Sequence, residues 1–206
     1  MGMVSFEFHF DFGSPNTYMS HRLIPGIEAR TGVACTYVPV LLGGIFKLTN
    51  NRSPMEQFGD IKNKPEYLQL EMQRFIARHG FDKYKRNPHF PVITVQVIRG
   101  ALVAEEEGYF KDYVEAVYVA MWENQQKMDD PEVIRTNLDA AGLDGAHILS
   151  RIGEQPIKDK LIANTQASVD RGAFGSPTFF VGDEMFFGKD RLVEVEEELM
   201  RQVGRA

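Results

Sequence analysis

Three short segments contain residue types that suit the binding of an anion or of an extended peptide. The first, Phe12-Gly13-Ser14-Pro15, places a serine directly before a proline, which is typical of a helix start. The unpaired N–H groups at a helix start favour an anion, and the Ser14 hydroxyl can donate a hydrogen bond to it. The simpler alternative is that Ser14 only caps the helix, and these residues taken alone favour that alternative.

The other two segments lie near the end of the chain. Phe174-Gly175-Ser176-Pro177 repeats the four residue types of the first segment but leads into apolar residues typical of a strand. Phe187-Gly188-Lys189-Asp190 stands at the expected start of the last helix. Asp190 therefore either complements the positive end of that helix or holds the ammonium group of a ligand.

Several kinds of chemistry are absent from the sequence. It contains no glycine-rich phosphate loop and no hydrolase serine motif, and its 5 histidines show no metal-ligand spacing, so no metal site is expected. The 1 cysteine, Cys35, excludes an internal disulfide and a two-cysteine redox centre. We expect Cys35 to be a small buried residue of a strand, and a reducing cytoplasm is the simplest location for the protein.

The composition is that of an ordinary globular protein and argues against two classes of partner. The chain has 206 residues, of which 43% are hydrophobic and 25% are charged. Its formal net charge of -6 argues against non-specific binding to nucleic acid, which needs a basic surface. No apolar run is long enough to cross a membrane, so neither nucleic acid nor a membrane is expected as a partner.

The elements that must position the three segments follow from hydrophobic periodicity. Strict alternation from Val4 to Phe12 predicts a strand, and Gly13 ends it. A helix to about Arg30 and a second strand over about 33–42 complete a strand–helix–strand unit. The pattern is then mostly helical over about 45–173. A hairpin over 177–187 and a final helix over about 189–203 close the chain.

This order of elements predicts an α/β protein with a thioredoxin-like domain and a large helical insertion domain. Residues 1–42 and 174–206 would form the thioredoxin-like domain, and residues 43–173 the inserted helical domain. Ser14 and Thr17 would then stand where thioredoxin-like proteins carry their two redox cysteines. The same fold favours a cis peptide bond at Ser176-Pro177. We expect Asp11, on the polar side of the first strand, to face this site or the insertion.

Four segments, in their order and spacing, resemble the 2-hydroxychromene-2-carboxylate isomerases. These enzymes belong with the kappa-class glutathione transferases, inside the DsbA-like thioredoxin group. The resemblance covers nearly the whole chain. The segments are Asp11-Phe12-Gly13-Ser14-Pro15, Asn87-Pro88-His89-Phe90-Pro91, Gly175-Ser176-Pro177-Thr178-Phe179 and Phe187-Gly188-Lys189-Asp190-Arg191-Leu192.

The resemblance implies glutathione as the cofactor and assigns three of these segments to it. Ser14, followed by Pro15, would hold the glutathione thiol as a thiolate. The loop at Ser176 and Pro177 would pair with the cysteinyl backbone of glutathione. Asp190, with Lys189 beside it, would bind the γ-glutamyl ammonium group.

The resemblance also implies two further contacts with glutathione, from residues that lie along the chain between the two halves of the thioredoxin-like domain. Asn51 is the better match for an asparagine that contacts glutathione, and its neighbour Asn50 is the alternative. Lys64 is the better match for a lysine at the glycine end of glutathione, and Lys62 is the alternative. The loop Thr49-Asn50-Asn51-Arg52-Ser53-Pro54 departs from the Gly-Asn-x-Pro-Pro run common in relatives, which affects the pocket for the aromatic substrate.

The resemblance implies a reaction and two alternatives to it. A glutathione thiolate would add reversibly to a small aromatic unsaturated keto acid and allow cis–trans exchange between 2-hydroxychromene-2-carboxylate and trans-o-hydroxybenzylidenepyruvate. One alternative is a kappa-like glutathione transferase or peroxidase that acts on small electrophiles. The other is a non-catalytic thioredoxin-like module that binds peptides and has no need of Asp190 and Lys64. Relatives are usually homodimers, so a homodimer is expected.

Overall fold

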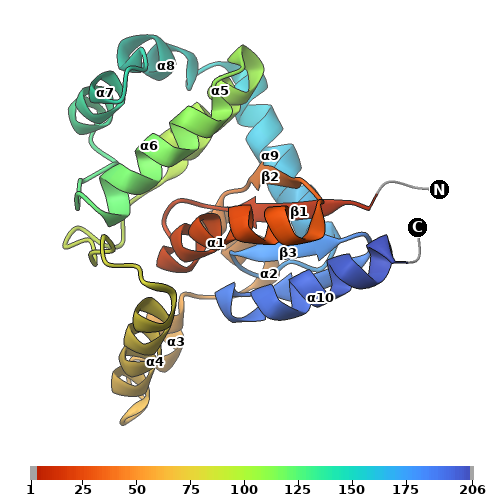
Figure 1. Cartoon of the computed structure of the whole chain (residues 1–206). Coiled ribbons are helices and arrows are strands. Elements are labelled where there is room, and N and C mark those ends of the chain that lie inside the picture. Colours follow the sequence, from red (N-terminus) through yellow and green to blue (C-terminus); the bar gives the residue numbers. More distant parts are fainter. Residues whose placement is uncertain (1–3, 205–206) are drawn as a thin grey trace.

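The computed structural model describes residues 4–204, and a four-stranded mixed sheet lies at its centre (Figure 1). The strand order is β2-β1-β3-β4. β1 (Phe6–Phe10) pairs in parallel with β2 (Cys35–Pro39) and antiparallel with β3 (Thr178–Val181). β4 (Glu184–Phe187) pairs antiparallel with β3, as the expected hairpin requires.

The alternation of β1 places aromatic and polar side chains on opposite faces of the sheet. Phe6, Phe8 and Phe10 are fully buried in the main core. On the opposite face, His9 is also buried and hydrogen-bonds Ser168 at 2.9 Å and Glu7 at 3.0 Å. Polar residues are tolerated on this covered face because each of them has a polar partner.

Helices cover both faces of the sheet (Figure 1). On one face lie α1 (Pro15–Thr31) and α10 (Leu192–Val203), which contact each other. On the other lie α2 (Leu42–Thr49) and α9 (Gln155–Asp170), which also contact each other. A short 3-10 turn, η1 (Lys189–Arg191), precedes α10, where the sequence pattern predicts one continuous helix.

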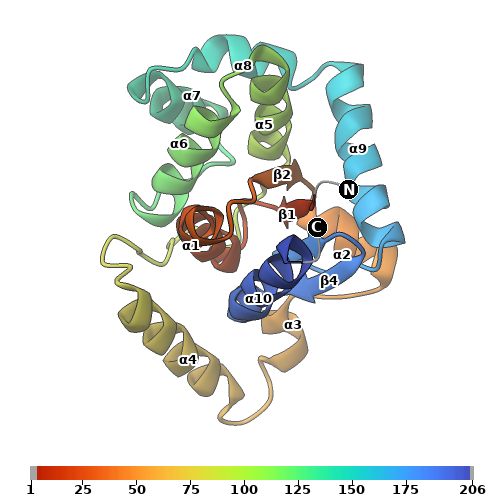
Figure 2. The ribbon, with the colours of Figure 1, turned by 45° about the vertical axis from the view of Figure 1, so that its right-hand side comes forward.

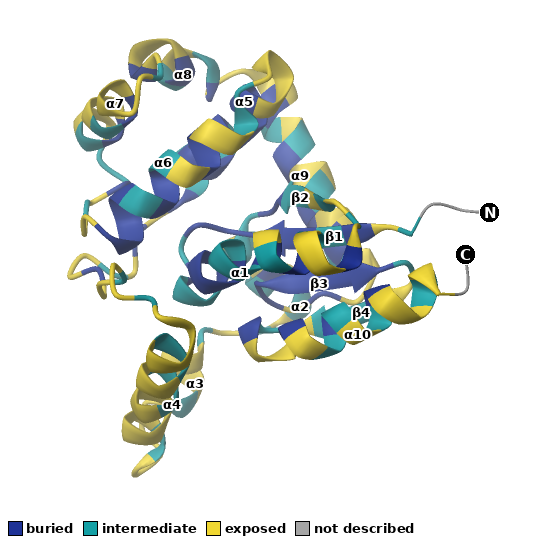
Figure 3. Ribbon diagram, in the orientation of Figure 1, coloured by how far each residue is buried: buried dark blue, intermediate teal, exposed yellow. Residues whose placement is uncertain are grey.

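The remaining helices lie between β2 and β3 along the chain, and they form two groups in space. One group lies together on one side of the sheet and consists of α5 (Val95–Glu107), α6 (Phe110–Trp122), α7 (Pro131–Ala140) and α8 (Gly145–Arg151). The other is an arm made of α3 (Pro54–Phe58) and α4 (Lys64–His79), which stands apart from the first group in Figure 2. Figure 3 shows that α4 is largely exposed, and none of its residues is buried.

The architecture agrees with the α/β fold and helical insertion expected from the sequence. Within residues 45–173 the structure describes helices and loops but no strand. Three short helices, α2, α3 and α8, were not predicted, because the glycines of α2 and the shortness of α3 and α8 hide their periodicity. The exact division into domains stays a prediction.

Candidate active site

Ser14 lies at the end of β1, where the chain turns into α1. It is the N-cap residue of α1 with an extended backbone (φ -97°, ψ 124°), and Pro15 is the first residue of the helix. The Ser14 side chain makes no capping hydrogen bond, although only 7% of the residue is exposed. The simple capping role considered from the sequence is therefore not observed, and the hydroxyl is free to donate to a ligand at the positive end of the helix.

Hydrogen bonds within the turn that contains Ser14 hold its conformation. The backbone N–H of Ser14 donates to the Asp11 carbonyl at 3.3 Å. The buried Thr17 hydroxyl donates to the carbonyls of Asp11 at 2.8 Å and Ser14 at 2.6 Å. Thr17, which is predicted to occupy the place of a second redox cysteine, therefore has a structural role in this turn.

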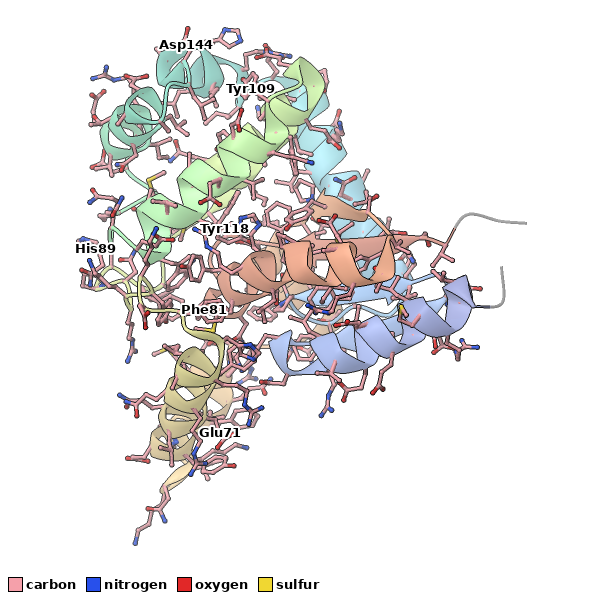
Figure 4. The ribbon with its side chains drawn as sticks, in the orientation of Figure 1. Glu71, Phe81, His89, Tyr109, Tyr118 and Asp144 are labelled. Atoms are coloured by element: carbon pink, nitrogen blue, oxygen red, sulfur yellow. The ribbon has the colours of Figure 1, made fainter. Side chains whose placement is uncertain are left out.

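The helical insertion supports the same turn from the other side. The Trp122 indole N–H of α6 donates to the Phe12 carbonyl at 2.9 Å. The Tyr118 ring of α6 packs edge-on against Phe12, with the ring centroids 4.9 Å apart. Figure 4 shows Tyr118 between α6 and α1. A displacement of α6 would consequently move the loop that contains Ser14.

The loop before β3 contains the expected cis peptide bond at Ser176-Pro177. Ser176 is 7% exposed, and its hydroxyl donates to the His9 carbonyl at 3.2 Å, near the end of β1. Because β1 leads directly to Ser14, this bond holds the cis-proline loop and the Ser14 turn at the same end of the sheet.

Asn51 joins the α2–α3 connection to the cis-proline loop. Its side-chain Nδ2 donates to the Phe174 carbonyl at 2.7 Å. Its Oδ1 accepts from the Arg52 backbone N–H at 2.8 Å and from Gln57 Nε2 at 2.6 Å. Both the nitrogen and the oxygen of the Asn51 side-chain amide are therefore hydrogen-bonded within the protein. Asn50 is the C-cap residue of α2 and has a left-handed backbone conformation (φ 53°). The predicted contact of either asparagine with glutathione stays a prediction.

Lys189 and Asp190 are joined to the cis-proline loop through the residue before them. The Gly188 backbone N–H donates to the Pro177 carbonyl at 3.0 Å. Lys189 is 7% exposed, and its Nζ lies 2.6 Å from Asp190 Oδ1 and 4.0 Å from the centre of the Phe75 ring in α4. The Asp190 side chain is 67% exposed, so its carboxylate is accessible to a ligand ammonium. The buried lysine and its contact with α4 were not apparent from the sequence.

Lys64 stands apart from this group. It begins α4, and its Nζ lies 3.5 Å from the centre of the Phe58 ring in α3. Phe75, the residue of α4 that meets Lys189, is about 16 Å further along the helix axis at 1.5 Å per residue. Lys62 is exposed in the turn before α4. The structure therefore links the segments of Ser176, Asn51 and Asp190 through hydrogen bonds of these residues and their neighbours, and β1 leads from the same loop to Ser14. The role of Lys64 or Lys62 stays a prediction.

Asp11 is the charged group closest in sequence to Ser14, and it is 1% exposed. Burial raises the pKa of its carboxyl group, and hydrogen bonds from Thr94, Gly13 and Leu42 act against that rise. Thr94 precedes α5, so Asp11 does face the insertion, as expected from the sequence.

Other kinds of site are not found in residues 4–204. In this range no three residues among histidine, cysteine, aspartate and glutamate are arranged to hold a metal ion. No helix in the same range is long and apolar enough to cross a membrane. Cys35 is half-buried, and burial together with Glu28 and Glu7 raises the pKa of its thiol, so it is poorly suited to act as a nucleophile.

Comparison with known proteins decides the family. Residues 6–200 match the profile of the DSBA-like thioredoxin domain. The chain belongs to the DsbA-like thioredoxin family. The correspondence of Ser14 and Thr17 to the two redox cysteine positions of this family stays a prediction.

Curated relatives of this DsbA-like protein include enzymes of two kinds. It is 25% identical over 196 residues to a 2-hydroxychromene-2-carboxylate isomerase of Pseudomonas putida, covering 95% of this chain and 94% of the relative. It is 28% identical over 200 residues to the isomerase of Sphingobium xenophagum, covering 94% and 97%. It is 24% identical over 199 residues to glutathione S-transferase kappa 1 of Rattus norvegicus, covering 90% and 86%. These relatives confirm the resemblance inferred from the motifs.

Solved structures agree on the fold. A structure of 2-hydroxychromene-2-carboxylate isomerase superposes with a TM-score of 0.81 at 24% identity, covering 97% of this chain and 96% of that one. A probable DsbA oxidoreductase of Streptomyces coelicolor gives a TM-score of 0.77 at 16% identity, covering 98% and 91%. At these identities the likeness shows the fold.

Proposed function

We propose that this protein is a glutathione-dependent isomerase that interconverts 2-hydroxychromene-2-carboxylate and trans-o-hydroxybenzylidenepyruvate. The observation that carries the proposal is the buried Ser14 hydroxyl, which does not cap α1 and follows the strand to which the cis-proline loop is hydrogen-bonded. The isomerases among the relatives support the reaction class, and the kappa transferase supports glutathione as the thiol.

The residues present fit glutathione. The exposed Asp190 carboxylate is a partner for the γ-glutamyl ammonium group. The backbone of Ser176, turned by the cis bond, presents an edge that can pair with the cysteinyl backbone. Ser14 can donate one charge-assisted hydrogen bond to sulfur, and the start of α1 favours the thiolate.

When bound, glutathione supplies a thiolate that adds to the conjugated double bond of the keto acid, leaves that bond single for rotation, and departs again. This chain contributes the hydrogen bond from Ser14 and the positive end of α1. Phe174 and Phe187 are 41% and 42% exposed with ring centroids 4.4 Å apart, and they supply apolar surface beside the cis-proline loop. These two rings support an aromatic substrate.

The test is incubation with trans-o-hydroxybenzylidenepyruvate, followed by its ultraviolet absorbance, with and without glutathione. We expect fast interconversion only when enzyme and glutathione are both present. S-Methylglutathione, which has no free thiol, is the matched control and should not support the reaction. Equal rates with and without glutathione would contradict the proposal.

A kappa-like glutathione transferase is the second candidate, and the relative from Rattus norvegicus favours it. Such an enzyme would use the same thiolate to conjugate small electrophiles. Assays with 1-chloro-2,4-dinitrobenzene and with cumene hydroperoxide distinguish the two candidates. Turnover of either compound, without isomerisation of the keto acid, would favour the transferase or peroxidase.

We also propose that the protein is a cytoplasmic homodimer. The exposed apolar side chains of the α3–α4 arm, Met55, Ile61, Tyr67 and Leu70, support a protein contact there. Sedimentation should show twice the monomer mass of 23.4 kDa. A single species at the monomer mass at micromolar concentration would contradict this proposal. Fractionation of cells should place the protein with cytoplasmic markers.

A further inference from the structure

The buried carboxylate of Asp11 lies where the N-terminal ends of three helices converge. Its Oδ1 accepts from the Gly13 backbone N–H at 2.8 Å and from the Thr94 hydroxyl at 2.6 Å, and its Oδ2 accepts from the Leu42 backbone N–H at 2.7 Å. Gly13 precedes the N-cap of α1, Leu42 is the first residue of α2, and Thr94 is the N-cap of α5. One side chain therefore joins the three helices.

Asp11 also fixes the turn that presents Ser14. Its carbonyl accepts from the Ser14 backbone N–H at 3.3 Å and from the Thr17 hydroxyl at 2.8 Å. There is little room around this turn, because a Cβ atom at Gly13 would lie 3.2 Å from Thr94 Cγ2 and 3.3 Å from Asp11 Oδ1. The side chain and the backbone of Asp11 together determine where the Ser14 hydroxyl lies.

Among the described residues, the groups that hydrogen-bond or face the Asp11 carboxyl group are all neutral. From α1, α2 and α5 it meets the Gly13 N–H, the Leu42 N–H and the Thr94 hydroxyl. From α6 it faces Tyr118, whose burial keeps its pKa well above the ordinary tyrosine value, so that the phenol stays neutral. Among the described residues no ammonium or guanidinium group acts on the Asp11 carboxyl group, and burial raises its pKa.

We propose that Asp11 is the positioning residue of Ser14 and that its charge is coupled to the ionisation of a thiol held there, so that the two acids titrate as a pair. The second part of this proposal, the coupling of the two ionisations, rests on the proposed function, in which Ser14 holds a thiolate. The Asp11 carboxylate accepts from the backbone N–H of Gly13, the residue before Ser14, so it lies within about 10 Å of a sulfur atom at position 14. At that separation two negative charges raise each other's pKa by about one pH unit at the effective dielectric constant of a protein.

The test places a thiol at position 14 itself, so that it does not require glutathione to bind. In a Cys35→Ala background, the Ser14→Cys protein is alkylated with iodoacetamide over pH 4 to 10, and the rate reports the thiolate fraction. We expect Asp11→Asn in this protein to lower the midpoint of the alkylation profile by about one pH unit or more. The exposed Asp183→Asn, in the β3–β4 turn, is the matched control and should leave the midpoint unchanged.

A purely structural role for Asp11 predicts a different result. Loss of the hydrogen bonds alone would leave the midpoint unchanged or raise it, and either result in a folded Asp11→Asn protein would overturn the proposal. Failure of native protein to bind glutathione would contradict the proposed function instead, because the alkylation experiment is independent of that ligand.

A second measurement keeps Asp11 intact, in case Asp11→Asn does not fold. The carboxyl carbon of Asp11 is titrated by nuclear magnetic resonance in the native chain and in the Ser14→Cys protein. We expect the Asp11 curve of the Ser14→Cys protein to differ from that of the native chain, by a raised apparent pKa or by a second step at the pH where the thiol ionises, since coupling is reciprocal. Identical titration curves for Asp11 in the two proteins would overturn the proposal.

Discussion

Ser14 is a buried serine with a hydroxyl that its own helix does not use. A hydroxyl is too weak an acid to be the attacking atom without a base, and none of the described hydrogen bonds of Ser14 involves a histidine. The positive end of α1 and a donor hydroxyl instead suit a sulfur anion. At the scale of single residues, the structure thus favours a serine that stabilises a thiolate.

Replacement of Ser14 by alanine tests this role. The Ser14→Ala protein loses one hydrogen bond to a charged group, which is worth about 1.5–3 kcal/mol. The isomerisation rate at neutral pH should fall roughly ten- to hundredfold, and it should recover partly at higher pH, where the thiol ionises without help. The measurement is the pH–rate profile at saturating glutathione.

The exposed Ser150→Ala, in α8, is the matched control, because it also removes one hydroxyl and leaves the Ser14 turn intact. Complete inactivity of Ser14→Ala at every pH, together with a covalent adduct on Ser14 in the native protein, would show that Ser14 is the nucleophile.

Asp190 is the second residue whose role can be isolated. Asp190→Ala removes the exposed carboxylate that we propose binds the γ-glutamyl ammonium group. We expect the affinity for glutathione, measured by calorimetry, to fall at least roughly tenfold, as for the loss of a charged hydrogen bond. Asp183→Ala removes an exposed aspartate from the neighbouring hairpin and should bind like the native chain. Equal affinities of the native and Asp190→Ala proteins would refute this role.

At the scale of elements, the packing of α5 against α6 determines how firmly the insertion supports the Ser14 turn. Gly100 in α5 allows Tyr113 of α6 to approach the helix backbone, where the Tyr113 hydroxyl donates to the Val97 carbonyl at 2.8 Å. A Cβ atom at Gly100 would lie 2.1 Å from that hydroxyl oxygen. The glycine is therefore required by this close contact.

Gly100→Ala should destabilise the protein by about 1–3 kcal/mol, because overpacking forces the Tyr113 ring to move and breaks its buried hydrogen bond. The free energy of unfolding in urea measures the effect. Gly43→Ala in α2 is the control, since a Cβ atom there meets nothing within 4 Å. It should be neutral or stabilise by up to about 1 kcal/mol through helix propensity. Equal stability of the Gly100→Ala and native proteins would contradict the packing described.

At the scale of the whole molecule, an ion-pair network joins α1 of the sheet layer to α6 of the insertion. His21 hydrogen-bonds Glu115 at 3.0 Å, and Arg22 contacts Glu115 at 2.8 Å and Glu123 at 2.6 Å. The hydrogen bond from His21 and those from Arg22 hold the pKa of Glu115 down at about 2. A carboxyl with a lowered pKa stabilises the folded state above its unfolded value and loses that contribution as the pH falls through its folded value.

Glu115→Gln should accordingly lower the unfolding temperature at pH 7. The difference from the native chain should shrink as the pH falls from about 5 toward 2. The Glu115 side chain is 48% exposed, so the effect at pH 7 should stay below about 1 kcal/mol. Thermal unfolding monitored by circular dichroism measures it, with the exposed Glu197→Gln of α10 as control. A difference that is constant from pH 7 to pH 3 would show that the network does not act through the charge of Glu115.

Local patterns in the sequence were sufficient for the order of the strands and of the longer helices, and for the two serine–proline loops of the site. Alternation of phenylalanines predicts β1, and serine–proline pairs mark the start of α1 and the approach to β3, because these signals depend only on neighbouring residues. The absence of redox cysteines is likewise visible in the sequence alone. The short helices α3 and α8 escaped prediction because about one or two turns contain too few residues for a period to show.

Contacts between distant segments were decided only by the tertiary structure. The Asp11 carboxylate meets Leu42 and Thr94, and Asn51 meets Phe174, across 31, 83 and 123 positions of the chain. Lys189 is buried against Phe75 of α4, although a lysine at a helix start reads from the sequence as exposed. The sequence determined which residue types stand at the end of β1, whereas folding determined which of them are buried, charged and paired, because burial and partners depend on segments brought together from far along the chain.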